Sequence, residues 1–451
     1  MGKYSDRLAE FAASATYDQL PADVARTTRL TIMDTLGCIA YGARTEPGRR
    51  VGGMVQEVSA AGGGATVFGH GTAPSPMAAV ANGTMAHSFE LDDRNTESMF
   101  HASASVLPAA LAVGQEVGGD GKKLMLAMAI GHEVASRVSN SVNPDAYVFG
   151  WHSQGWHPTL GAAAAAGVML DLTPEQLQHA LGLAATQASG LIEVAFSSDG
   201  KPFHAGKAAM GGVVAARLAK RGYTGGLNAL EGSDRAKGFC YLLSPEPKME
   251  AIVDTLGTEY KIHSRNGLKP YSCAGDMHPG IDALLEMMPK HEIGPEDIES
   301  IEIYSFRIVP THFDIPHPKA TIEGLMSYQH SLAVTVLYGK CTPAQFSDEM
   351  LDDPVVDAMR EKIHLHLDEE LDKLFPEFYT ARTELVTNKG NFEQTVLHTK
   401  GDPENPMSEE EIEAKFSDLL EQSPLKANGK KLLEQLRELE ELADVRELAI
   451  N

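Results

Sequence analysis

Small residues at helical spacing dominate residues 76–230, and they constrain the fold more than any other feature of this sequence. Alanine-rich stretches with helical periodicity cover residues 124–138, 160–170, 174–189 and 205–219. A helix that is apolar nearly all round belongs inside a bundle rather than at its surface. Small side chains also let neighbouring helix backbones approach closely. This part of the chain therefore predicts a compact helical bundle.

The composition changes near residue 263. Residues 298–309 alternate apolar and polar side chains, many of them β-branched, which predicts a strand. Residues 382–401 form two alternating runs around Asn388-Lys389-Gly390-Asn391, which predicts a β-hairpin. Helical patterns at 277–289, 321–338 and 346–359 lie between these segments.

Helical periodicity returns after Pro406, where Ser408 is a suitable N-cap followed by acidic residues. A helical tail after an α+β segment indicates that the last helices pack on the first domain. We therefore expect a mainly α fold, with a large all-helical domain built from residues 1–263 plus 405–451. Residues 264–404 should form a smaller α+β domain.

Charge and cysteine content exclude several classes of protein. The 451 residues carry 38 Lys+Arg against 62 Asp+Glu, a formal net charge of -24, which opposes nucleic-acid binding. The four cysteines include no CxxC pair, so a thiolate metal site is not expected, and the pattern fits the reducing cytoplasm. The N-terminus does not resemble a signal peptide, and no run of 18 apolar residues predicts a membrane span.

The first candidate site is the polar stretch at residues 85–108, between two apolar segments. Its ionisable side chains are Glu90, Asp92, Asp93, Arg94, Glu97 and His101. Such a cluster suits a helix end or loop that holds reactive groups in front of packed helices. The alternative is a solvated loop with a capping aspartate.

The second candidate is the stretch from Tyr147 to Thr159, which holds both tryptophans, Trp151 and Trp156, together with His152 and His157. Aromatic rings and histidines beside glycines suggest a pocket wall that Tyr147 would also line. A well-packed aromatic loop is the alternative, with His157 at a helix start.

The third and fourth candidates supply cations. Lys201, His204 and Lys207 precede an alanine-rich helix, where positive charge is unfavourable unless an anion binds among them. Solvated lysines are the alternative. Lys269 and His278 lie at the junction of the two predicted domains, a favoured place for ligands, although His278 could also be a core or capping residue.

Together these side chains suit a small polyanion such as a di- or tricarboxylate. Cations orient the carboxylates, and a base with a suitable pKa removes a proton alpha to one of them. No metal-ligand set is evident, since His132-Glu133 lacks the second histidine of HExxH, so activity should survive chelation.

Several motifs in order along nearly the whole chain resemble the MmgE/PrpD family. They are AHSFELDDRN with a following histidine, GWHPTLGAAAAAGVMLDLTPEQ, KPFHAGKAAMGG, KPYSCAGDMHPG and KGDPENPMSEEEIEAKF. This family includes 2-methylcitrate dehydratase, cis-aconitate decarboxylase and iminodisuccinate epimerase. The resemblance implies an all-helical domain with an inserted α+β lid, a homodimer and no required cofactor.

The resemblance also implies roles for individual residues. The expected catalytic residues are His101, His157, Lys201 and Asp93, and the expected substrate-binding residues are Glu90, Arg94, Tyr147, His204, Lys269 and His278. The sequence departs from the dehydratase and decarboxylase branches at Glu90, Arg94 and Ala102. Ala274 stands near a histidine of the decarboxylase branch, which disfavours decarboxylation.

The leading expectation is a cofactor-independent, dehydratase-type lyase acting on a small di- or tricarboxylate. An epimerase of an amino- or imino-dicarboxylate, a cis-aconitate-type decarboxylase and a non-catalytic binding protein on the same scaffold are the alternatives. Lys269 or His278 is expected to reach the substrate from the lid side.

Overall fold

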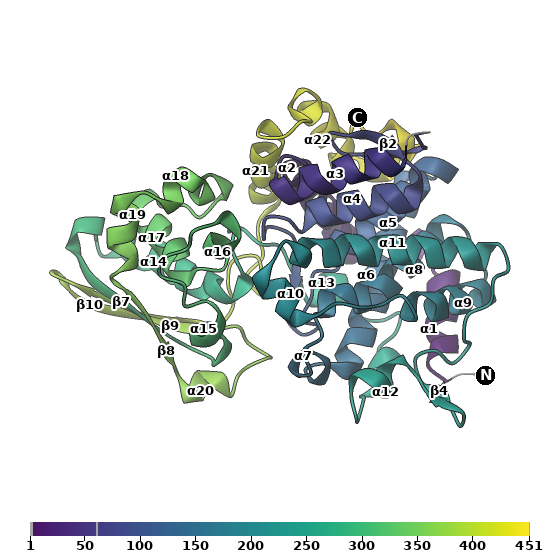
Figure 1. The fold of residues 1–451 in the computed structure, drawn as a ribbon, viewed down its shortest axis with the longest axis horizontal. Helices are drawn as coiled ribbons and strands as arrows, with labels where there is room; N and C mark the ends of the chain where they lie inside the picture. Colours follow the sequence, from purple (N-terminus) through teal and green to yellow (C-terminus); the bar gives the residue numbers. More distant parts are fainter. Residues whose placement is uncertain (1–2, 60–61, 451) are drawn as a thin grey trace. The chain divides into compact units, whose positions relative to one another are not determined.

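The computed structural model describes residues 3–59 and 62–450, and the chain forms two compact units. Unit 1 comprises Met1–Ser88, Asp92–Asn266 and Ser408–Asn451, and unit 2 comprises Phe89–Leu91 and Gly267–Met407. Helices dominate the secondary structure (Figure 1), so the predicted mainly helical fold class is confirmed. The role of unit 2 as an inserted lid and the predicted domain boundaries stay predictions.

Unit 1 is a bundle of helices with a few very short strands. Its helices are α1 Ser5–Ser14, α2 Ala22–Gly42, α3 Glu46–Val58, α4 Ser75–Ala86, α5 Ser103–Val117, α6 Gly121–Val142, α7 Asp145–Val148, α8 His157–Met169, α9 Pro174–Ala185, α10 Ile192–Ser197, α11 Gly200–Lys220, α12 Phe239–Leu243, α13 Lys261–Ser264, α21 Glu409–Glu421 and α22 Gly429–Arg437. Its strands are β1 Ala65–Val67, β2 Gly71–Ala73, β3 Arg94–Asn95, β4 Gly232–Ser233 and β5 Ala236–Lys237. Helix α3 ends at Val58, and residues 60–61 lie outside the described part of the chain.

Helix α11 packs closely against α4, α5 and α8 in unit 1. A Cβ on Gly206 would lie 2.2 Å from the main-chain oxygen of Val80 in α4, and one on Gly212 would lie 2.5 Å from a backbone nitrogen of α8. Only glycine fits at such distances, which are far inside van der Waals contact. These two close approaches fix the position of α11, whose first two turns carry Lys201 and His204.

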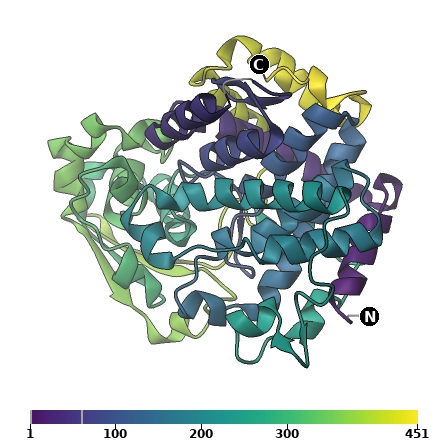
Figure 2. The same cartoon turned by 45° about the vertical axis from the view of Figure 1, so that its right-hand side comes forward.

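The last helices of the chain return to unit 1, where α21 and α22 pack on α2 (Figures 1 and 2). The side chains of Asp34 on α2 and Lys415 on α21 form an ion pair, with Nζ 2.6 Å from Oδ1. The Asp34 side chain is fully buried and that of Lys415 is 10% exposed. Burial lowers the pKa of Lys415, but the charges of Asp34 and Asp92 and the contact with Asp34 outweigh it and raise that pKa. Lys415 therefore stays charged inside the unit.

Unit 2 contains a four-stranded mixed sheet in the order β10-β9-β7-β8. The strands are β7 Ile298–Ser305, β8 Ile363–Leu367, β9 Ala381–Thr387 and β10 Gly390–Val396. Strand β7 runs parallel to β8 and antiparallel to β9, and β9 pairs with β10 from Thr387↔Gly390 to Val396↔Ala381. The hairpin predicted at residues 382–401 is confirmed.

The helices of unit 2 are α14 His278–Lys290, α15 Ile308–His312, α16 Thr321–Leu325, α17 Tyr328–Tyr338, α18 Asp348–Leu351, α19 Pro354–Arg360 and α20 Glu369–Asp372. The strand predicted at 298–309 ends at Ser305, and α15 begins three residues later. The helix predicted at 321–338 is divided into α16 and α17, since Ser327 caps the second helix by accepting a hydrogen bond from the His330 amide. In the described part of the chain, no helix combines the length and the apolar content that crossing a bilayer requires.

Candidate active site

The first part of the candidate site comes from two nearby segments of unit 1, one at the end of α4 and one at Asp92. His87 follows α4, and the chain then contributes Phe89–Leu91 to unit 2 before it returns at Asp92. The Nδ1 of His87 donates a hydrogen bond to Oδ2 of Asp92 at 2.7 Å, and both side chains are fully buried. Because a carboxylate can only accept, a neutral His87 carries its proton on Nδ1.

His101 lies beside His87, with ring centroids 4.7 Å apart and Oδ2 of Asp92 3.7 Å from its Nδ1. Its Nδ1 donates to the main-chain carbonyl of Asp93 at 2.6 Å, and its amide donates to Oε1 of Gln154 at 2.8 Å. A carbonyl oxygen cannot donate, so the neutral His101 ring has its lone pair on Nε2. The side chain is 19% exposed, which makes Nε2 of His101 a candidate general base.

Asp93 lies in a buried network behind His101. Its carboxylate accepts hydrogen bonds from the amide of Ser103 at 3.2 Å and from its hydroxyl at 2.7 Å, and that hydroxyl lies 2.9 Å from Nε2 of His132. Burial and then the charge of Asp92 raise the pKa of Asp93 to about 7, and burial lowers the pKa of His132 to about 3. These contacts fix the backbone at residue 93, whose carbonyl orients His101.

His152 and His204 form the second part of the site. Their Nδ1 atoms are 2.8 Å apart and share a hydrogen bond, and both side chains are buried. Burial lowers the pKa of His152 well below its usual value, and charges on Lys201, His204, His87 and His101 lower it further, in that order. Those four side chains therefore lie within electrostatic range of His152, and all five belong to unit 1.

Lys207 holds the segment 187–190, against which the loop with His152 packs. Its ammonium donates to the main-chain oxygens of Gln187 at 3.1 Å and Ser189 at 2.9 Å, and to the Ser189 hydroxyl at 2.7 Å. The loop with His152 is attached to this segment where the His152 amide donates to the Gly190 carbonyl at 3.2 Å. Of the three cations expected at the start of α11, Lys207 therefore binds backbone, whereas Lys201 and His204 belong to the histidine cluster.

The structure places His157, a predicted catalytic residue, in the core of unit 1. It is fully buried, its Nδ1 lies 3.1 Å from the hydroxyl of Ser139, and its ring contacts the rings of Phe100 and Phe239. Its Nε2 has no hydrogen-bond partner in the described part of the chain. The histidine that joins the cluster is His152, which the sequence analysis named only as part of the aromatic loop.

Two further members of the cluster, His87 and Asp92, were not predicted as catalytic. The sequence signal for His152 was present, because Gly-Trp-His occurs twice, at 150–152 and at 155–157. His157 of the second copy is the first residue of α8 and is therefore packed in the bundle. The first copy lies in the preceding loop. The rings of Trp151 and Trp156 contact each other at a tilt of 54°, with centroids 4.7 Å apart.

The remaining predicted substrate-binding residues are divided between the units. In unit 2, Nζ of the buried Lys269 donates to Oε2 of Glu90 at 3.2 Å, and the ring of the buried His278 packs edge-on against Tyr271. In unit 1, Arg94 is buried, whereas Tyr147 is half-buried on α7. That residues of both units serve one substrate stays a prediction.

One trio in the cluster has metal-ligand chemistry. His87, Asp92 and His101 each offer one ligand atom, and these atoms lie within 4.8 Å of one another. His87 and Asp92 are already joined by their own hydrogen bond, which a metal ion would have to replace if it used the same atoms. No metal site was predicted from the sequence, because the members of this trio are brought together only by the fold.

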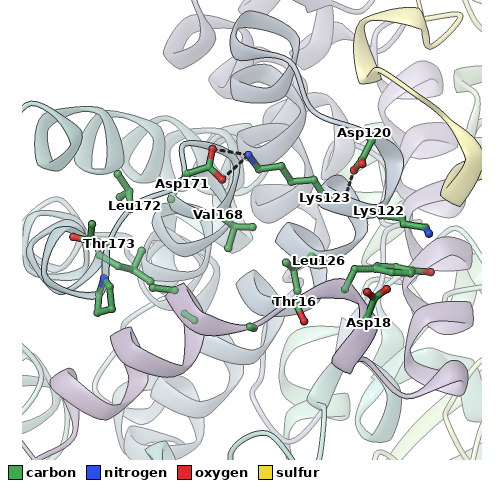
Figure 3. A pocket seen from close by; sticks show the side chains of 17 residues that line it. Thr16, Asp18, Asp120, Lys122, Lys123, Leu126, Val168, Asp171, Leu172 and Thr173 are labelled. Carbon is green, nitrogen blue, oxygen red and sulfur yellow. Dashed lines mark hydrogen bonds and ion pairs between the residues drawn. The ribbon is translucent and has the colours of Figure 1, made fainter.

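Unit 1 also has an open cavity of about 660 Å³ between the end of α1 and the start of α6 and α9 (Figure 3). Lys123 lies in its wall with Nζ 2.8 Å from both carboxylate oxygens of Asp171, and Nζ of Lys122 lies 5.6 Å from the centroid of the Tyr17 ring. None of the clustered histidines lines this cavity.

Because His157 is buried as a neutral ring, the folding stability of the protein should fall at acid pH. Burial lowers its pKa to about 3, so folding favours the neutral ring, and stability is present above pH 6.5 and lost as the pH falls toward 3. We expect roughly 2 kcal/mol of folding free energy to be lost through this residue between pH 7 and pH 5. Urea unfolding at both pH values should show that loss in the parent and a correspondingly smaller one in His157→Asn. Equal losses would mean that His157 is not buried as a neutral ring.

Comparison with known proteins supports the resemblance found in the sequence. Residues 6–252 match the MmgE/PrpD N-terminal domain and residues 271–440 match the MmgE/PrpD C-terminal domain. The chain therefore belongs to the MmgE/PrpD family, as the sequence motifs predicted, and it is an enzyme of the lyase type.

Curated relatives match over almost the whole chain. A cis-aconitate decarboxylase of Aspergillus terreus is 27% identical, over 97% of this chain and 93% of the relative. The cis-aconitate decarboxylase-like protein oryM of Aspergillus oryzae is 26% identical over 99% and 96%, and the cis-aconitate decarboxylase of Mus musculus is 25% identical over 95% and 88%.

Proposed function

We propose that this enzyme is a cofactor-independent lyase that acts on a small tricarboxylate by removing a proton alpha to a carboxylate. The proposal rests on one observation, the cluster in unit 1 that combines two separate proton-carrying arrangements with a lysine. His101 has its lone pair on Nε2, and the His152–His204 pair shares a second proton. Lys201, which influences the pKa of His152, supplies a positive charge for a substrate carboxylate or a developing enolate.

Dehydration uses both arrangements. A base removes the proton from carbon, the C–O bond breaks, and an acid protonates the departing hydroxide to give water. Decarboxylation needs only one proton, which is added to the carbon that loses carbon dioxide. The presence of a base and a separate proton donor therefore favours a dehydratase over a decarboxylase.

Decarboxylation is the second candidate, because the relatives are named cis-aconitate decarboxylases. Against it, the decarboxylase branch that the sequence resembles carries a histidine near the position of Ala274. In this protein Ala274 is buried in unit 2. The homodimer implied by the family resemblance stays a prediction.

The test is a direct assay of the purified enzyme with 2-hydroxytricarboxylates, with cis-aconitate and with aspartate-derived dicarboxylates, followed by proton NMR in deuterium oxide. The expected result is an unsaturated tricarboxylate formed from a hydroxy acid. Carbon dioxide release from cis-aconitate would replace the dehydratase by the decarboxylase. Deuterium exchange at the alpha carbon without net product would indicate the epimerase, and no reaction with any acid that binds would contradict catalysis.

The lysine assignment can be tested with a matched pair on one helix. Lys201→Met should raise KM or lower kcat/KM by about 10²-fold, in line with the loss of a charge-assisted hydrogen bond in an active site. Lys220→Met, an exposed lysine in the last turn of the same helix, should leave both constants unchanged. Equal kinetics of the two variants would remove Lys201 from the site.

A further inference from the structure

The contact between His152 and His204 joins two atoms of the same kind. Their Nδ1 atoms are 2.8 Å apart, and the rings are tilted at 46° with centroids 5.0 Å apart. A hydrogen bond between two imidazole nitrogens requires one to carry a proton and the other a lone pair. A neutral pair therefore exists in two forms, which differ in the direction of this hydrogen bond.

The surroundings keep both rings neutral. Burial lowers the pKa of His204 to about 4, and charge on His87 and Lys207 adds to this effect. Burial likewise lowers the pKa of His152, with Lys201, His204, His87 and His101 as the charged or chargeable groups around it. Both rings are neutral before and after the shared proton moves from one to the other, so the transfer leaves no lasting buried charge.

The backbone leaves room for this contact at Gly190. A Cβ on Gly190 would lie 3.5 Å from Nδ1 of His204 and 3.3 Å from the main-chain oxygen of His152. The close approach of α11 to α4 at Gly206 fixes His204 from the other side. The two rings are therefore held together by packing on both sides.

We propose that His204 and His152 form a proton relay, in which His204 sets the tautomer of His152 and resupplies the proton that His152 gives up. The proposal rests on the function proposed above, since it names the source of the proton for the leaving hydroxide. His204 acts through His152 and is a positioning residue.

The relay conserves protons at each step. In the first form, Nδ1–H of His204 donates to Nδ1 of His152, which carries its own proton on Nε2. When His152 gives the Nε2 proton to the departing hydroxide, the Nδ1 proton of His204 crosses to Nδ1 of His152, and a water molecule protonates Nε2 of His204 and leaves as hydroxide. That hydroxide is neutralised by the proton that His101 took from carbon. One proton has entered and one has left. Both rings are neutral again, with their hydrogen bond reversed and a lone pair on Nε2 of His152.

The test separates proton transfer from simple support by using His204→Asn and His204→Ala. Asparagine places an amide near the position of Nδ1 and keeps a hydrogen bond to His152, but it cannot pass a proton on. We expect both variants to lower kcat by about 10²-fold with little change in KM, and added imidazole to restore part of the activity of His204→Ala only. His179→Asn is the control and should keep the parent kcat, since His179 lies on α9 with its Nδ1 3.0 Å from the Gly225 carbonyl.

Near-parental kcat in His204→Asn would overturn the relay and leave a supporting role. Selective ¹⁵N labelling of histidine provides an arm that needs no substrate. The parent should show His152 exchanging between its two neutral tautomers, and His204→Asn should show one of them alone. A single fixed tautomer of His152 in the parent would overturn the relay even if the enzyme is a dehydratase. An exchanging pair in an enzyme that dehydrates nothing would instead overturn the proposed function.

Discussion

The His101→Asn variant is expected to lose turnover by about 10²–10⁴-fold, the usual loss for a group that transfers a proton. Asparagine can still donate to the carbonyl of Asp93, to which Nδ1 of His101 donates at 2.6 Å, so the backbone around residue 93 should keep its position. What disappears is the lone pair on Nε2. Steady-state kinetics with the substrate found in the assay, together with deuterium exchange at the alpha carbon, measure this loss.

His157→Asn is the matched variant, since it makes the same substitution at the other predicted catalytic histidine. Its side chain contacts Ser139, Phe100 and Phe239 in the core. The expected result is lower stability with kcat within a few-fold of the parent. The opposite pattern, in which His101→Asn turns over normally and His157→Asn does not, would show that the base has been assigned to the wrong ring.

The Lys415→Met variant is expected to lose about 3–5 kcal/mol of folding stability, because removal of one partner leaves the other charge buried without compensation. Asp34 has a fully buried side chain, and the ammonium of Lys415 lies 2.6 Å from it. Urea unfolding of the whole chain measures the effect, and activity should follow the folded fraction.

Removing both charges provides the control. In the double variant Asp34→Asn/Lys415→Met no charge of the pair remains, so most of the lost stability should return. Lys426→Met, which breaks only an exposed pair with Glu421, should change stability by less than about 1 kcal/mol. The losses of stability in Asp34→Asn and Lys415→Met should be measured separately. If the double variant loses as much stability as the sum of these two, the two side chains do not act as a pair.

Local patterns predicted the elements that depend on neighbours in sequence. The alanine-rich helices of unit 1 and the hairpin of β9 and β10 follow from periodicity and turn residues alone. The strand at 298–309 was predicted too long, because the apolar alternation continues past Ser305 into residues that pack as α15. Periodicity does not show where the register of a strand ends.

The candidate site was predicted less completely, and the reason is geometric. His101, Lys201 and His204 were found because each lies in a polar stretch inside an apolar context. His152 and His157 share the same local motif, and only packing decides which of them enters the bundle. His87 follows an apolar helix, and its only sequence signal is its place in the AHSFELDDRN motif.

The pairing of Asp34 with Lys415 has a consequence for the order of synthesis. A ribosome delivers α21 roughly 20–80 s after α2, at ~5–20 residues per second. During that interval Lys415, whose ammonium pairs with Asp34 and lies in the field of Asp92, has not yet been synthesised. The helical unit therefore cannot reach its final charge balance while the chain is emerging, and its completion has to wait for the arrival of the last helices.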